Sequence, residues 1–177
     1  MNITKAHKTE WGSYTDRTNS YDDSEDIKLF FNMVKKDKSL KEYLSSFLPA
    51  EPEFLRKHPN GDFGVDIGIM SKNKIVATID VERWRPWKED WPSYYSYIHF
   101  LGRKEKFLNE YKVPFFMAFM NYSMTKVLMI SEQDIRKYPT KPKTFASGIT
   151  DRVRELSMSD GHVFGENITK RERELFQ

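Results

Sequence analysis

The chain contains no cysteine, no long apolar run and no internal repeat. The absence of cysteine excludes disulfide bonds, thiol nucleophiles and zinc sites built from thiolates. No stretch approaches the ~20 consecutive apolar residues that a membrane-spanning helix requires, and no apolar signal region follows the first residues. We therefore expect a cytoplasmic protein, in the host cytoplasm if the chain is viral, without a membrane partner.

The short motifs of several common enzyme classes are also missing. The sequence has no phosphate-binding loop, no dinucleotide-binding fingerprint, no Gly-x-Ser-x-Gly and no His-Glu-x-x-His. Any catalytic chemistry must therefore rest on a less conspicuous group of side chains.

What is present suits one globular domain. The chain has 177 residues, of which 38% are hydrophobic and 31% are charged, enough for a sizeable core and a hydrated surface. Its formal charge of +3 is unevenly placed: residues 1–26 hold three basic and six acidic residues, whereas residues 83–112 hold seven basic and four acidic ones. Residues 136–177 add nine basic and six acidic side chains. This distribution would suit a polyanion, and an ordinary solvated surface explains it equally well.

The most informative stretch predicts a β-hairpin. Residues 63–70 and 74–84 are rich in Ile, Val and Phe, and a polar turn separates them. Because side chains alternate along a strand, Asp80 and Glu82 point the same way, about 6–7 Å apart. Asp66 lies in the first predicted strand, where an unpaired buried carboxylate would be costly. Antiparallel pairing would bring it near Asp80, and three clustered carboxylates would favour a hard cation such as Mg²⁺ or Mn²⁺.

An acid on one hairpin strand, followed by an acid-x-(Lys or acid) tripeptide on the next, resembles the PD-(D/E)XK nuclease superfamily. Here thirteen residues separate Asp66 from Asp80, and Glu82 takes the place of the usual motif lysine, as in some restriction endonucleases of this fold. Lys104 is our candidate for the missing cation. The match extends over residues 27–130.

The resemblance implies an α/β (α+β) fold with a restriction-endonuclease-like core, in which helices flank a central mixed β-sheet. It also implies a nuclease that hydrolyses phosphodiester bonds with Mg²⁺ or Mn²⁺, and a DNA endonuclease in particular. The catalytic residues would then be Asp66, Asp80, Glu82 and Lys104, with the three acids as metal ligands. Many nucleases of this kind form homodimers to cut two strands, so a homodimer is one open state.

A basic and aromatic stretch follows the second predicted strand. Arg83, Arg85 and Trp87 could stack on bases or hold phosphates. Alternatively, the Trp residues cover the sheet edge and the Arg residues pair with the nearby acids. Arg103 and Lys104 stand near the start of a predicted helix, where basic side chains are unfavourable unless they have a phosphate to bind or are simply exposed to solvent.

Two other function classes stay open on the sequence alone. The missing motif lysine is compatible with a non-catalytic nucleic-acid-binding or regulatory protein that retains the nuclease fold. A small interaction protein, in which the acids only form salt bridges, is the third reading.

The remaining chain divides into an irregular arm at 1–24, a nuclease-like core at 25–131 and a basic C-terminal extension at 132–177. The apolar spacing and turn signals predict further elements within these parts. We expect helices at 24–36, 40–47, 102–111, 150–156 and 169–176, strands at 95–100, 113–120 and 126–130, and loops at 49–62 and 157–162.

Overall fold

The computed structural model describes residues 14–15, 25–59 and 64–176, and it has a mixed α+β architecture. The irregular arm expected at 1–24 lies outside these ranges except for residues 14–15, and so does the end of the predicted loop at 49–62. The first elements are β1 (Tyr14–Thr15), α1 (Glu25–Lys36), α2 (Lys38–Ser45), β2 (Phe54–Lys57), β3 (Ile67–Ser71), β4 (Lys74–Arg83), β5 (Ile98–Leu101), η1 (Gly102–Lys104), α3 (Glu105–Glu110), β6 (Phe115–Met120) and β7 (Lys126–Ser131). They are followed by α4 (Glu132–Arg136), β8 (Lys141–Thr144), β9 (Thr150–Leu156), η2 (Met158–Asp160), β10 (His162–Gly165) and α5 (Lys170–Leu175).

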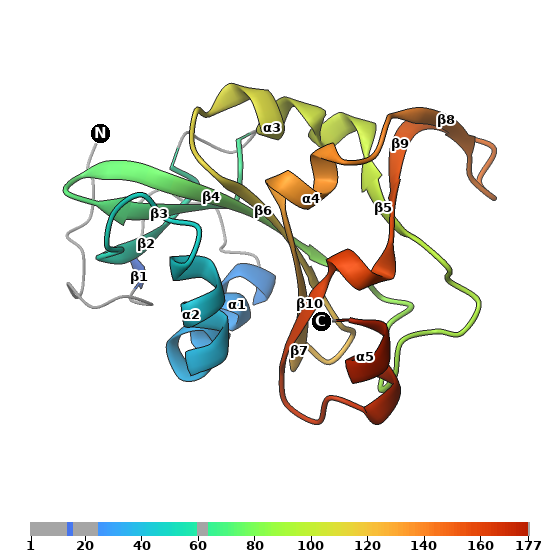
Figure 1. Ribbon diagram of the computed structural model, residues 1–177, viewed down its shortest axis with the longest axis horizontal. Helices are drawn as coiled ribbons and strands as arrows, with labels where there is room; N and C mark the ends of the chain where they lie inside the picture. The colour runs from blue at the N-terminus through green and yellow to red at the C-terminus, as the bar shows by residue number, and fades with distance from the viewer. Residues whose placement is uncertain (1–13, 16–24, 60–63, 177) are drawn as a thin grey trace.

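Two sheets organise the molecule (Figure 1). The main sheet has the strand order β1-β2-β3-β4-β6-β7-β10, with β4 parallel to β6 and antiparallel pairing from β2 to β4. The smaller sheet has the order β5-β9-β8 and is antiparallel. A mixed sheet accompanied by helices was predicted, and this coarse class is confirmed.

Apolar cores cover both faces of the main sheet. Phe30 of α1 and Leu44 of α2 pack with Ile79 of β4 on one face. On the other face, Trp87, Phe100 and Phe107 pack with Met117 of β6. Strand alternation therefore sends neighbouring side chains of β4 into two different environments.

The β3–β4 hairpin forms where the sequence predicts it. Lys72 and Asn73 adopt positive φ angles of 47° and 60°, as a tight two-residue hairpin turn requires. Ile67 pairs with Ile79 across the hairpin, so the residue before β3 comes opposite the residue after Ile79. Asp66 lies just outside β3 and not within it as predicted, because regular pairing begins at Ile67.

Two sequence predictions in other segments are wrong. Thr150–Leu156 is strand β9 and not a helix, because its backbone pairs with both β5 and β8. Part of the predicted loop at 49–62 is strand β2, which pairs with β3. The chain after η2 forms β10 beside β7, so the C-terminal segment completes the main sheet. The predicted C-terminal helix is present as α5.

Among the residues described, none of the helices has the length and apolar character to cross a membrane.

Candidate active site

The hairpin brings Asp66 and Asp80 together. The Asp66 carboxylate accepts a hydrogen bond at 2.8 Å from the backbone N–H of Val81, which fixes it against β4. Asp80 is buried and pairs in register with Met117 of β6, on the face that Trp87 and Phe100 cover. Glu82, two residues further along β4, lies on the same face and is more exposed.

Lys104 completes this group from a different part of the chain. Its Nζ lies 2.5 Å from Asp80 Oδ2 and 2.9 Å from Glu82 Oε2. Burial alone would lower the pKa of Lys104, but the charges of the two carboxylates raise it above its ordinary value, so the side chain stays protonated. The candidate for the missing motif cation therefore lies against the acids of the motif.

The smaller sheet positions Lys104. A Cβ atom on Gly102 would lie 2.6 Å from the backbone oxygen of Arg152, so only glycine lets η1 approach β9 this closely. Arg154 of β9 then binds the Glu105 carboxylate through two nitrogens, at 2.7 and 3.1 Å. The turn that carries Lys104 is thus held on both sides.

Asp66 lies where a negative charge is unfavourable. Burial first and the nearby Asp80 second raise the pKa of its carboxyl to about 7, although the Val81 hydrogen bond and the charge of Lys104 act in the opposite direction. At neutral pH in the absence of metal, a substantial fraction of Asp66 therefore carries a proton. A cation beside the carboxylate would release that proton.

This raised pKa predicts how stability varies with pH. The ordinary pKa of the group is 3.8 and the folded value is about 7. Its stabilising contribution is therefore complete below pH 3.8 and is lost as the pH rises through 7, a loss of about 4 kcal/mol at about 1.4 kcal/mol per pKa unit. Asp66→Asn, which cannot ionise, should lack this loss. Urea unfolding in EDTA from pH 4 to 9 measures it, and parallel pH curves for the two proteins would contradict the assignment.

The oxygen donors suit a small divalent cation. Among the described residues, no group of three or more acidic, His or Cys side chains is positioned to hold a metal. Asp66 and Asp80 nevertheless form a close pair of carboxylates, and Mg²⁺ is commonly bound by one or two carboxylates, water and substrate phosphate. The raised pKa of Asp66 also marks a place where positive charge is favoured. Asp66 and Asp80 could therefore hold a Mg²⁺ or Mn²⁺ ion, whereas Glu82 is bound to Lys104.

The basic and aromatic residues after β4 divide into two groups. Trp87 is fully buried and donates its indole N–H to Glu172 at 2.6 Å, so its ring is not accessible to a base. Arg83 donates to the backbone oxygen of Tyr122 and also lies 3.9 Å from Asp26, so it is tied to its own fold and not to Asp80 or Glu82. Arg85 and Arg103 are exposed and available to a phosphate.

A further acid named by the resemblance lies elsewhere. The PD-(D/E)XK resemblance implies that an acid on the first helix can join the metal site, which makes Glu42 of α2 a candidate, although a Glu among Lys residues on a helix is more often solvated. Glu42 forms an i,i+4 ion pair with Lys38 on the exposed face of the helix, as a solvated residue would.

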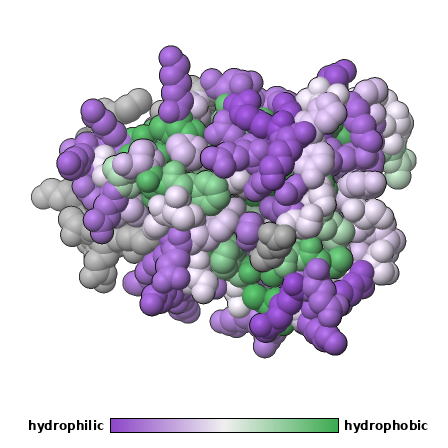
Figure 2. All heavy atoms as spheres, viewed as in Figure 1, coloured by the Kyte–Doolittle hydropathy of each residue, from purple (hydrophilic) through white to green (hydrophobic). Residues whose placement is uncertain are grey.

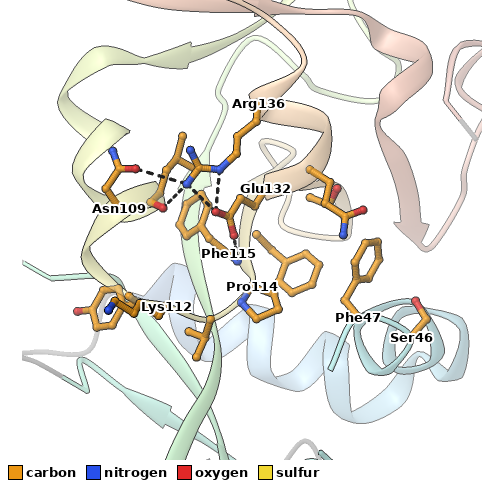
Figure 3. Close-up of a pocket in the computed structure, with 14 residues that line it drawn as sticks. Ser46, Phe47, Asn109, Lys112, Pro114, Phe115, Glu132 and Arg136 are labelled. Carbon is orange, nitrogen blue, oxygen red and sulfur yellow. Dashed lines mark hydrogen bonds and ion pairs between the residues drawn. The ribbon is translucent and has the colours of Figure 1, made fainter. Parts of the chain in front are cut away.

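A hollow of about 750 Å³ opens at the start of β6, away from the acids (Figure 3). Arg136 and Glu132 face it, but they bind each other at 2.9 Å, and Glu132 also accepts the backbone N–H of Phe115. The charged groups of Arg136 and Glu132 thus already have partners within the protein. Asp66, Asp80, Glu82 and Lys104 do not line this hollow.

Comparison with known proteins adds no relative from which residue roles can be transferred. No protein-family model matches the chain, and no curated protein matches it. The roles of Asp66, Asp80, Glu82 and Lys104 therefore depend on the geometry described above and on the short motif in the sequence.

Proposed function

We propose that this chain is a metal-dependent nuclease that hydrolyses phosphodiester bonds, and specifically a DNA endonuclease with a restriction-endonuclease-like core. One observation carries the proposal: Asp80 and Glu82 of the sequence motif lie within 2.9 Å of the Lys104 ammonium, beside the partly protonated Asp66. The group contains the acids and the cation that the superfamily motif requires, although the lysine comes from a different element.

Each residue has a distinct proposed role. Asp66 and Asp80 would hold Mg²⁺ or Mn²⁺, with Glu82 as a further ligand or as the general base for the attacking water. When bound, the metal lowers the pKa of that water and stabilises charge on the phosphate. Lys104, which remains protonated, would neutralise the negative charge that develops on the phosphate oxygens. Arg103, exposed one residue earlier, would bind the nucleic-acid backbone.

A specific observation also favours a second function. Lys104 already neutralises Asp80 and Glu82, so a lysine could replace a metal ion in a fold that no longer cuts. The protein would then be a non-catalytic nucleic-acid-binding or regulatory protein. Glu in place of the usual motif lysine supports this alternative.

Cleavage of supercoiled and linear DNA tests both proposals. We expect the wild-type protein to cut in Mg²⁺ or Mn²⁺ and not in EDTA, and Mg²⁺ to raise its melting temperature. Lys104→Met should slow cleavage about 10²–10³-fold, because a pre-organised charge opposite the phosphate is lost, while metal-dependent stabilisation persists.

If the protein instead binds nucleic acid without cutting it, the wild type and Lys104→Met should behave differently from this. A wild-type protein that retains DNA in a salt-sensitive manner, never cuts it and gains no stability from Mg²⁺ would rule out the nuclease. Lys104→Met would then acquire Mg²⁺ stabilisation, since Asp80 and Glu82 would have lost their resident cation. Absence of both cleavage and DNA binding would reject both functions.

A further inference from the structure

The loop between β4 and β5 carries two exposed aromatic side chains close to the proposed active site. It connects the strand that bears Asp80 and Glu82 to the turn that bears Lys104. Tyr94 has 75% and Tyr97 has 51% of its surface exposed. Side chains this exposed contribute little to the core and are open to contact with a partner.

A series of ring contacts joins Tyr94 to the end of β4. Trp84 comes two residues after Glu82, and its ring stacks on Trp91 with the ring centroids 4.5 Å apart. Tyr95 meets Trp84 edge to face at 4.6 Å, and Tyr94 lies 4.8 Å from Tyr95. The exposed ring of Tyr94 is therefore the outer end of an aromatic cluster that begins beside the acids.

The loop is anchored along its length. The backbone N–H of Tyr122 donates to the Trp87 oxygen at 2.6 Å, and Asn121 donates to the Lys88 oxygen at 3.1 Å. Further on, Trp91 donates its indole N–H to the Tyr95 oxygen at 3.3 Å. Such fixing means that the exposed tyrosines lose little conformational freedom on binding a partner.

Cations stand among the aromatic residues of the loop. Arg85 and Lys88 are exposed within it beside two acids, Glu89 and Asp90, and Arg103 is a further exposed cation just beyond β5. In Figure 2 the right-hand side of the molecule, where this loop runs in Figure 1, is pale, because Trp, Pro, Ser and Tyr have intermediate hydropathy. Rings interleaved with cations are the combination that proteins use to bind single-stranded nucleic acid.

We propose that the exposed rings of Tyr94 and Tyr97, in the loop at 84–97, form a stacking platform for unpaired bases, and that the substrate of the acidic site is single-stranded or locally unpaired nucleic acid. The statement about substrate depends on the nuclease proposal, whereas the platform itself does not. In a duplex the faces of the bases are covered by their neighbours, so a tyrosine ring has nothing to stack on except at an end. An unpaired strand offers a base face at every nucleotide.

Equilibrium binding in EDTA tests the platform without cleavage. Fluorescence anisotropy should show that the full-length protein binds a 20-nucleotide oligo(dT) more tightly than a 20-base-pair duplex. Tyr94→Ala/Tyr97→Ala should weaken binding of the single strand at least about tenfold, because stacking on two bases is lost. Tyr94→Phe/Tyr97→Phe keeps the rings and should bind like the wild type. Ile149→Ala, at another exposed apolar position, should also leave the affinity unchanged.

An abasic strand separates stacking from charge. If the rings stack on bases, the wild type and the double alanine variant should bind a 20-nucleotide abasic strand equally weakly. Equal affinity of the two proteins for oligo(dT), or equal affinity of the wild type for strand and duplex, would overturn the platform. Measuring the affinity for a 20-nucleotide oligo(U) in the same way shows whether the protein binds RNA in preference to DNA. If this binding pattern holds but Mg²⁺ never produces cleavage, the nuclease proposal fails and the platform stands.

Discussion

Asp80→Ala should lower the rate of metal-dependent DNA cleavage by about a thousandfold or more. Asp80 has two tasks in the proposed site: it provides a metal ligand beside Asp66 and it holds the Lys104 ammonium at 2.5 Å. Losing either task impairs charge stabilisation in the transition state, and a single such contribution is typically worth 10²–10³-fold. Single-turnover cleavage of a labelled substrate measures the loss, because it reports the chemical step separately from product release.

The variant should still fold. The buried Lys104 ammonium keeps Glu82 as its ion-pair partner at 2.9 Å, so its charge is not left unpaired. Glu42→Ala is the matched control, since it removes an acid that the sequence also suggests but that lies on the exposed face of α2, and it should cut at the wild-type rate. Residual cleavage by Asp80→Ala within tenfold of the wild type would show that this carboxylate does not take part in the chemistry.

Glu172→Gln should lower the melting temperature by about 10 °C. Glu172 is fully buried and accepts hydrogen bonds from Lys126 Nζ at 2.9 Å and from the Trp87 indole at 2.6 Å. Neutralising it would leave the Lys126 ammonium, which is 2% exposed, without a counter-charge. Breaking one side of a buried pair costs about 3–5 kcal/mol, and in a chain of this size about 2–4 °C accompanies each kcal/mol. Calorimetry at neutral pH gives the shift.

Two comparisons make this result specific to the buried pair. Glu42→Gln breaks the exposed pair with Lys38 and should change the melting temperature by less than about 2 °C. Lys126→Met/Glu172→Gln removes both buried charges and keeps a side-chain oxygen as the acceptor for the Trp87 indole, so it should unfold at a higher temperature than Glu172→Gln alone. If the double variant were the less stable one, the desolvated charge would not be the cause.

The sequence predicts the hairpin and the face of its acids because both depend on local rules. Alternation along β4 sets the face of Asp80 and Glu82, but the register that brings Asp66 opposite Asp80 also requires a one-residue shift between Ile69 and Met70, which the two-residue turn does not specify. The position of Asp66 before β3 also depends on where pairing begins, which local pattern does not specify. The strand β9 was missed for a related reason: short segments are ambiguous between helix and strand until their pairing partners are known.

The sequence does not show which of the basic and aromatic side chains after β4 are buried and which are exposed, because this depends on the tertiary structure. Trp87 and Arg85 stand two residues apart in the same Trp- and Arg-rich stretch, yet one is buried and the other exposed. The difference arises because Glu172, far along the chain, accepts the Trp87 indole N–H. The exposed Tyr94 and Tyr97 were missed, although the Tyr, Ser and Pro residues just before β5 form a recognisable aromatic cluster in the sequence.

The close approach of η1 to β9 has a consequence for the later part of the chain. Gly102 lies close to the Arg152 backbone, and Arg154 binds the Glu105 carboxylate. The position of the Lys104 ammonium therefore depends on β9, which lies well outside the hairpin that carries the acids.

Removing the chain after residue 131 would therefore remove the supports of Lys104, and with them β10 and the Glu172 carboxylate that pairs with buried Lys126. A partner molecule that displaced β9 would shift the Lys104 ammonium relative to the Asp80 and Glu82 carboxylates without touching either acid.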